Sequence, residues 1–274
     1  LIIKNEIKGI SIIDDNEETV LLKVGAAENW HQFVKWTINQ GYSGLENLSL
    51  IPGNVGTSPI QNIGAYGKEV KDSITKVEGI FLNNGEIFSY KNSECNFNYR
   101  ESIFKNKLKG NIIINYVTFR LSKTEKHNIL YGEVSEELKK LNLEISTKNI
   151  SNVIMKIRKR KLPNPKIIGN CGSFFKNPII SSNKFKDLQK KFPKIIGYSL
   201  SEEKIKIAAG WIIDQCGWKG YRKGDVGVHE HQALVLVNYG NSSGREIISL
   251  AQEIQKSVLD KFDIEILPEV NIIE

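Results

Sequence analysis

A glycine-rich stretch, residues 44–67 (GLENLSLIPGNVGTSPIQNIGAYG), holds residue types that could bind a phosphate group. Its glycines permit positive φ angles and a close approach to a ligand, and its backbone N–H groups can form concave nests that suit a diphosphate. The glycines and polar side chains concerned are Gly53, Gly56, Gly64, Gly67, Thr57, Ser58, Gln61 and Asn62. Glycine spacing is a weak signal, and such a stretch alone more often indicates a buried turn between two strands.

An arginine and a serine stand in two further polar runs. Arg100 lies beside an aromatic residue in YRESIFK (99–105), where its permanent charge could stabilise a developing anion; a surface ion pair is the commoner role of a lone arginine. Ser173 lies in GNCGSFFKNP (169–178), where its hydroxyl could face a dry pocket; a well-placed serine there could give a proton. No GxSxG elbow supports a hydrolase triad. Nothing near Cys171 lowers its pKa, so we expect a small buried residue there.

Two short runs follow later in the chain. In LPEV (267–270), Glu269 could orient a substrate or move a proton, and an exposed acid on an edge strand is an equal alternative. In VHEHQ (228–232), His229 and His231 have the alternation that could place two metal ligands on one face of a strand. No third ligand shows matching spacing, so we expect no metal.

Strands with one helix must position the glycine-rich stretch. We expect strands over 1–13 and 19–25, and a helix carrying Trp30 and Phe33 that begins after Asn29 and stops at Gly41. Strands over 74–82 and 86–90 flank Asn84-Gly85, a strong hairpin signal, and another strand covers 111–121.

The later part of the chain alternates helices and strands. A helical stripe begins at Ile150, and Pro163 and Pro165 break that helix at a domain junction. Further helices are expected around 185–192 and 208–215, and a long one after the capping box formed by Ser243 and Glu246. Strands are expected over 233–237 and 264–266.

Composition limits the possible functions of this 274-residue chain. The net charge of +7 and pI near 9.1 fit phosphate-bearing partners, but no aromatic and basic interleaving supports a nucleic-acid binder. Its three cysteines form no CxxC motif, and no signal peptide or membrane-spanning run is recognisable, so we expect a cytoplasmic protein without membrane insertion. The chain begins at Leu1 within an apolar run, and we expect that the natural protein starts earlier.

Together these runs resemble the UDP-N-acetylenolpyruvoylglucosamine reductase family. The resemblance rests on runs that occur in the family's order, namely GLENLSLIPGNVG, SPIQNIGAYG, YRESIFK, GSFFKNP, AAGWIIDQCG, HQALVLVN and PEV. Each is weak alone, but the ordered set is specific. LYGEV, with Tyr131, is similar to the subclass that folds a tyrosine-bearing loop over the substrate.

The resemblance implies an NADPH-dependent FAD enzyme that makes UDP-N-acetylmuramate from its enolpyruvyl precursor in peptidoglycan synthesis. It implies three catalytic residues, with Ser173 as proton donor beside Arg100 and Glu269. The implied FAD-binding residues are Gly53, Gly56, Thr57, Ser58, Ile60, Asn62, Gly64 and Arg158. The implied substrate-binding residues are Tyr131, Lys161, Asn177, Lys219 and Gln232.

The implied fold class is α+β, with an FAD-binding domain of the vanillyl-alcohol-oxidase/PCMH type followed by an α+β substrate-binding domain. We expect the FAD-binding domain over 1–161, without the family's first glycine-serine-asparagine loop, and the substrate-binding domain over 162–262. We expect 263–274 to return to the first domain as a closing strand, and the protein to be a monomer. A flavin-free sugar-nucleotide-binding remnant and another FAD oxidoreductase of the same fold remain as alternatives.

Overall fold

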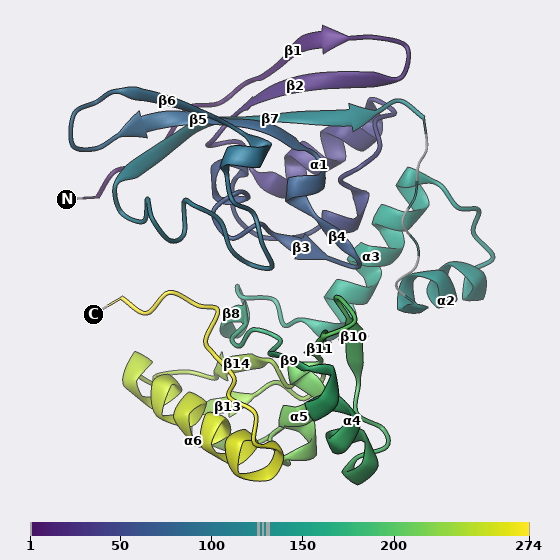
Figure 1. Ribbon diagram of the computed structural model, residues 1–274, viewed down its shortest axis with the longest axis vertical. Helices are drawn as coiled ribbons and strands as arrows, with labels where there is room; N and C mark the ends of the chain where they lie inside the picture. Colours follow the sequence, from purple (N-terminus) through teal and green to yellow (C-terminus); the bar gives the residue numbers. More distant parts are fainter. Residues whose placement is uncertain (1, 125–126, 128, 130–131, 274) are drawn as a thin grey trace. The chain divides into compact units, whose positions relative to one another are not determined.

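The computed structural model describes residues 2–124, 127, 129 and 132–273, and the chain divides into two compact units (Figure 1). The first unit is Leu1–Ile157 and the second is Arg158–Glu274. Both units combine helices with antiparallel strands, as the expected α+β class requires. Each buries its own apolar core, and each is described by itself.

A five-stranded antiparallel sheet forms the frame of the first unit, in the order β1-β2-β7-β5-β6 (Figure 1). Its strands are β1 Ile10–Asp15, β2 Thr19–Gly25, β5 Ile74–Phe81, β6 Ile87–Lys91 and β7 Ile112–Ser122. Strand β2 has the bounds expected from the sequence, and Gly85 turns between β5 and β6 at φ 74°. The first strand starts later than expected because Gly9 has φ 109°, outside the β region.

Helix α1 (Trp30–Asn39) packs its apolar stripe against this sheet. It begins where expected, since the Asn29 side chain accepts a hydrogen bond from the Gln32 N–H at 3.1 Å. Trp30 and Phe33 are buried, and their ring centroids lie 6.0 and 5.1 Å from that of Phe119 on β7. The helix therefore fixes the chain that leaves β2 and leads into the glycine-rich stretch.

Short elements and two further helices complete the first unit. The short elements are η1 Glu46–Leu48, η2 Val55–Thr57, β3 Gly64–Ala65, β4 Lys68–Glu69, η3 Val70–Asp72 and η4 Asn92–Glu94. Helix α2 (Gly132–Lys140), which the sequence reading missed, packs Val134 and Leu138 against helix α3 (Thr147–Lys161). The division between the units falls inside α3, earlier than the junction expected after Lys161.

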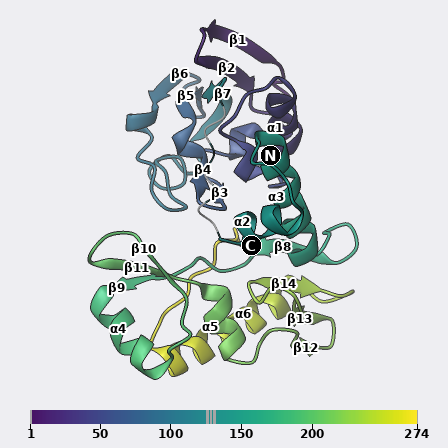
Figure 2. The same cartoon turned by 90° about the vertical axis from the view of Figure 1, so that its right-hand side faces the viewer.

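The second unit contains two small antiparallel sheets and three helices (Figure 2). The sheets have the strand orders β12-β13-β14-β8 and β10-β11-β9. The strands are β8 Gly169–Ser173, β9 Ile179–Ser181, β10 Gly197–Ser199, β11 Lys204–Ile207, β12 Arg222–Lys223, β13 Val226–Val228 and β14 Val235–Asn238. The helices are α4 Ser182–Lys191, α5 Ala209–Gln215 and α6 Gly244–Phe262.

Helix α6 lies along β13 and β14 and begins at the expected capping box. After it, Ile264 and Ile266 are fully buried in the core of the second unit, and the Gln255 side chain donates to the Ile266 carbonyl at 2.8 Å. The expectation that this segment returns to the first domain as a strand is therefore wrong. The alternating isoleucines do mark a buried segment, but they pack beneath α6 without strand pairing over 264–266.

Candidate active site

The glycine-rich stretch is bound to the connection between β2 and α1 by backbone hydrogen bonds. Val55 N–H donates to Glu28 O at 2.8 Å, and Gly56 N–H donates to Ala26 O at 2.9 Å. A Cβ on Gly56 would lie 2.5 Å from the Ala26 Cβ, so only glycine fits. Gly53 has φ 112°, again a glycine conformation, and its carbonyl accepts from Trp30 N–H.

The exposed residues of this stretch carry N–H donors that fit an FAD diphosphate. Gly53, Asn54 and Thr57 are exposed, and within the described chain the backbone N–H groups of Gly53 and Asn54 show no hydrogen bond. Uncharged N–H donors at the start of a helical turn favour an anion. This donor set fits the cofactor that the sequence implies.

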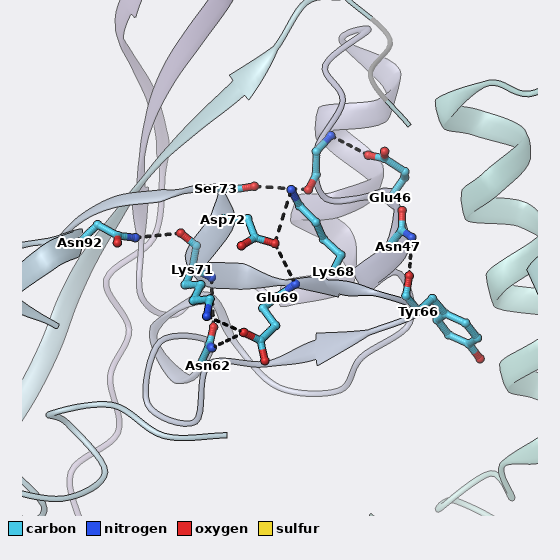
Figure 3. Close-up of polar contacts among 11 residues, drawn as sticks. Glu46, Asn47, Asn62, Tyr66, Lys68, Glu69, Lys71, Asp72, Ser73 and Asn92 are labelled. Atoms are coloured by element: carbon cyan, nitrogen blue, oxygen red, sulfur yellow. Dashed lines mark hydrogen bonds and ion pairs between the residues drawn. The ribbon is translucent and has the colours of Figure 1, made fainter. Parts of the chain in front are cut away.

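Two of the polar side chains assigned to FAD point into the protein instead. Ser58 is 0% exposed, and its hydroxyl donates to Val55 O at 2.7 Å. Asn62 is also 0% exposed, and its side-chain amide donates to Glu69 Oε2 and to Asn98 O, each at 3.0 Å. The Asn62 Oδ1 accepts from Lys71 N–H, and Glu69 pairs with the Lys71 ammonium (Figure 3). The network joins Asn62 to residues 69–71 at the end of this stretch.

Arg100 is joined directly to the glycine-rich stretch. Its guanidinium donates to the Gly64 carbonyl at 2.5 Å and to the Asn62 carbonyl at 3.5 Å. A Cβ on Gly64 would lie 2.9 Å from Arg100 Nη1, so Gly64 leaves room for the guanidinium. Ile60, the remaining residue assigned to this segment, is half-buried against the core, and its carbonyl accepts from Ser102. Arg100 is thus bound to backbone carbonyls.

Ser173 and Glu269, far apart in sequence, are neighbours in the second unit. Ser173 ends β8, paired with Val235 of β14. The next residue, Phe174, accepts from Glu269 N–H at 2.7 Å, while Lys176 N–H donates to Leu267 O at 2.9 Å. Phe174 and Phe175 are buried behind this pairing, whereas Ser173 itself is exposed. The structure therefore joins the segments that carry two of the three expected catalytic residues, and the Ser173 side chain is exposed in its own unit.

Two expected substrate ligands meet at the first turn of α5. The Asn177 Oδ1 accepts the Ala209 N–H at 2.9 Å, and a Cβ on Gly210 would lie 3.0 Å from the Gln232 Oε1. Lys219 follows the other end of this helix, where its ammonium lies 3.4 Å from an Asp214 carboxylate oxygen. Helix α5 thus organises three of the five assigned substrate residues.

Two of the three remaining assignments fall on α3. Arg158 and Lys161 stand in the last turn of α3, which carries four consecutive cations next to the negative end of the helix dipole. The Arg158 carbonyl accepts from Leu162 N–H, which continues the helix toward Pro163. Tyr131 lies outside the described residues.

His229 and His231 contact each other, and Cys171 is exposed. His231 N–H donates to the His229 Nδ1 at 3.3 Å, and burial lowers the pKa of His229. Within the described ranges, no group of three His, Cys, Asp or Glu side chains is placed to hold a metal ion. Cys171 is exposed on β8, which corrects the expectation of a buried residue, because alternate residues of this strand face outward.

Comparisons with known proteins identify both units. Residues 1–91 match the family model of an FAD binding domain, and residues 163–273 match that of the UDP-N-acetylenolpyruvoylglucosamine reductase C-terminal domain. The reductase of Flavobacterium johnsoniae is 50% identical over 275 residues, which cover 100% of this chain and 82% of the relative. That of Amoebophilus asiaticus is 47% identical over 274 residues, 100% of this chain and 81% of the relative.

A solved structure gives the same fold. The crystal structure of UDP-N-acetylenolpyruvylglucosamine reductase from Thermus caldophilus matches with a TM-score of 0.62 at 22% identity, over 91% of this chain and 71% of that one. The chain is thus a flavoprotein of the oxidoreductase class, with an FAD-binding domain and a reductase C-terminal domain. It belongs to the UDP-N-acetylenolpyruvoylglucosamine reductase family, as the ordered motifs predicted. Among the described residues, no helix combines the length and apolar character required to span a bilayer.

Proposed function

We propose that this chain reduces UDP-N-acetyl-enolpyruvoylglucosamine to UDP-N-acetylmuramate, with FAD as bound cofactor and NADPH as reductant. The observation that carries the proposal is the backbone hydrogen bond from Glu269 to Phe174, which joins the segment carrying Glu269 to the residue after Ser173 in the unit that matches the reductase C-terminal domain. The full-length identity to curated reductases supports it.

FAD, when bound, would supply the hydride chemistry, reduced by NADPH and then reducing the enol ether at C3. Among the residues proposed to hold it, Gly53 and Thr57 are exposed, whereas Gly56 and Gly64 let the stretch pack closely against Ala26 and Arg100. Residues 1–161 are the proposed FAD-binding domain. The proposed substrate-binding domain follows it.

The protein's own groups would manage charge and a proton. As hydride adds to C3, negative charge develops on the substrate carboxylate as an enolate, and we assign its stabilisation to Arg100 and Glu269. The Ser173 hydroxyl then gives its proton to C2. Asn177, Lys219 and Gln232, grouped around α5, are assigned to the sugar nucleotide, with Lys161 for its diphosphate.

The setting of the reaction is also a proposal. The described cysteines, Cys95, Cys171 and Cys216, are free thiols, which supports a reducing compartment such as the cytoplasm. The monomeric state stays a prediction.

The visible absorption spectrum of the purified chain with FAD tests the function. We expect a yellow protein that bleaches with NADPH and regains its colour when the enolpyruvyl sugar nucleotide is added. Colour and bleaching without recovery would support a different FAD oxidoreductase. A protein that binds the sugar nucleotide but takes up no FAD would support the flavin-free alternative and refute the proposal.

A further inference from the structure

Arg100 occupies a backbone conformation that an arginine rarely adopts. Asn98 and Glu101 exchange reciprocal backbone hydrogen bonds at 3.0 Å, so Tyr99 and Arg100 form the tip of a tight turn. Arg100 has φ 54°, in the left-handed region that turns of this kind usually fill with glycine or asparagine. Leu50, Asn62 and Tyr66, all in or beside the glycine-rich stretch, also have positive φ. Such strain persists only where surrounding contacts determine it, and it clusters at functional sites.

Hydrogen bonds on both sides of the turn bind it to the glycine-rich stretch. After the turn, the Ser102 hydroxyl donates to Ile60 O at 2.6 Å. Before it, the Asn98 carbonyl accepts from the Asn62 side chain at 3.0 Å. The Lys105 ammonium also donates to the Arg100 carbonyl at 3.1 Å. The turn is therefore anchored before, at and after the arginine.

The hydrogen bond from Ser102 to the Ile60 carbonyl is made by a buried side chain. Ser102 is 1% exposed, so water cannot easily replace its hydroxyl if the Ile60 carbonyl loses this partner. Asn62 is 0% exposed, and both its amide group and its Oδ1 are engaged within the protein. Neither side chain is directed to solvent, and both hold the segments that Arg100 joins.

We propose that Ser102 and Asn62 are positioning residues that set the place of the Arg100 guanidinium, an inference that rests on the proposed role of Arg100. Asn62 would thus serve the reaction through the arginine, and its side chain would not contact the flavin. Ser102 stands in the same YRESIFK run as Arg100, yet the sequence gives no sign of its distant partner Ile60.

A double-mutant cycle on the FAD-loaded protein tests the proposal. We expect Ser102→Ala to lower kcat for the enolpyruvyl sugar nucleotide about 10-fold, with flavin reduction by NADPH unchanged. In an Arg100→Ala background, the same change should lower kcat by less than about 2-fold, because the group that it positions is gone. Ser102→Thr, which retains the hydroxyl, should restore most of the activity. Equal losses from Ser102→Ala in both backgrounds would overturn the positioning role.

If Arg100→Ala itself left turnover unchanged, the assigned role of Arg100 would fail, which is a separate result from the one above. Amide hydrogen exchange on the chain without FAD adds a readout independent of activity. The Glu101 amide, which donates to Asn98 O, should exchange faster in Ser102→Ala, and unchanged protection would also overturn the proposal.

A milder variant is available in case Ser102→Ala does not fold. Lys105→Met removes the ammonium that binds the Arg100 carbonyl, and Lys107→Met changes an exposed lysine of the same loop as a matched control. We expect Lys105→Met to lower kcat and Lys107→Met to leave it unchanged. Equal activity in the two variants would contradict the proposed anchoring.

Discussion

Replacing Gly56 with alanine should disturb the glycine-rich stretch through a single contact. The new Cβ would lie 2.5 Å from the Ala26 Cβ and 3.2 Å from its Cα, against an ordinary contact of 3.4–4 Å. The two segments are also joined by the Gly56 N–H to Ala26 O bond, so they must separate by about 1 Å or break it. Overpacking of this kind costs about 1–3 kcal/mol. In a unit of this size that lowers Tm by about 2–12 °C.

The assay is thermal unfolding by circular dichroism, combined with the fraction of FAD retained after gel filtration. Gly132→Ala is the matched control, because that glycine is exposed in α2 and nothing lies within 4 Å of its added Cβ. We expect Gly56→Ala to unfold earlier and to lose flavin, while the control keeps or slightly raises Tm. A Gly56→Ala variant with wild-type Tm and full flavin content would refute the packing argument.

Three further predictions concern the second unit. Ser173→Ala should lower turnover about 100- to 10,000-fold and leave flavin reduction by NADPH intact, whereas the control Ser199→Ala on β10 should leave turnover unchanged. Normal turnover in Ser173→Ala would remove Ser173 from the mechanism. Asn177→Ala removes the acceptor of the Ala209 N–H, so it should lower the free energy of unfolding, measured with denaturant, by about 1 kcal/mol. An unchanged denaturation midpoint would count against this capping contact. Burial lowers the pKa of His229 from 6.5, so the unfolded chain takes up a proton first as pH falls. Stability should therefore fall below about pH 6.5, and His229→Gln should lessen that loss of Tm; an equal loss would oppose this reasoning.

Local chemistry made much of the first unit predictable. The cap at Asn29, the Asn84-Gly85 hairpin and the strand over 19–25 are predicted from a few neighbouring residues, and the structure has each of them. The segment around Ile264 and Ile266 was placed wrongly because its alternating isoleucines indicate only that it is buried. Which core receives it depends on packing against α6, a contact that sequence periodicity does not encode.

In the candidate site too, features set by neighbouring residues were predicted, and features set by contacts between distant segments were not. The glycine-rich stretch was recognised from residue type, and Ser173 and Glu269 from the family resemblance. The inward direction of Asn62 and the left-handed backbone of Arg100 were not foreseen, since both follow from hydrogen bonds between segments far apart in the chain. Ser102 was missed for the same reason.

The pairing of Phe174 with Glu269 also sets an order of events during biosynthesis. Residues 264–269 follow α6 in the chain, so they leave the ribosome after every strand and helix of the second unit. Until then Ile264 and Ile266 cannot fill their places in that core, and the residues that follow Ser173 lack their backbone partners Leu267 and Glu269. The first unit, whose sheet and α1 are complete much earlier, can fold while synthesis continues. A nascent chain would thus fold its FAD-binding domain before the segment around Ser173 is complete.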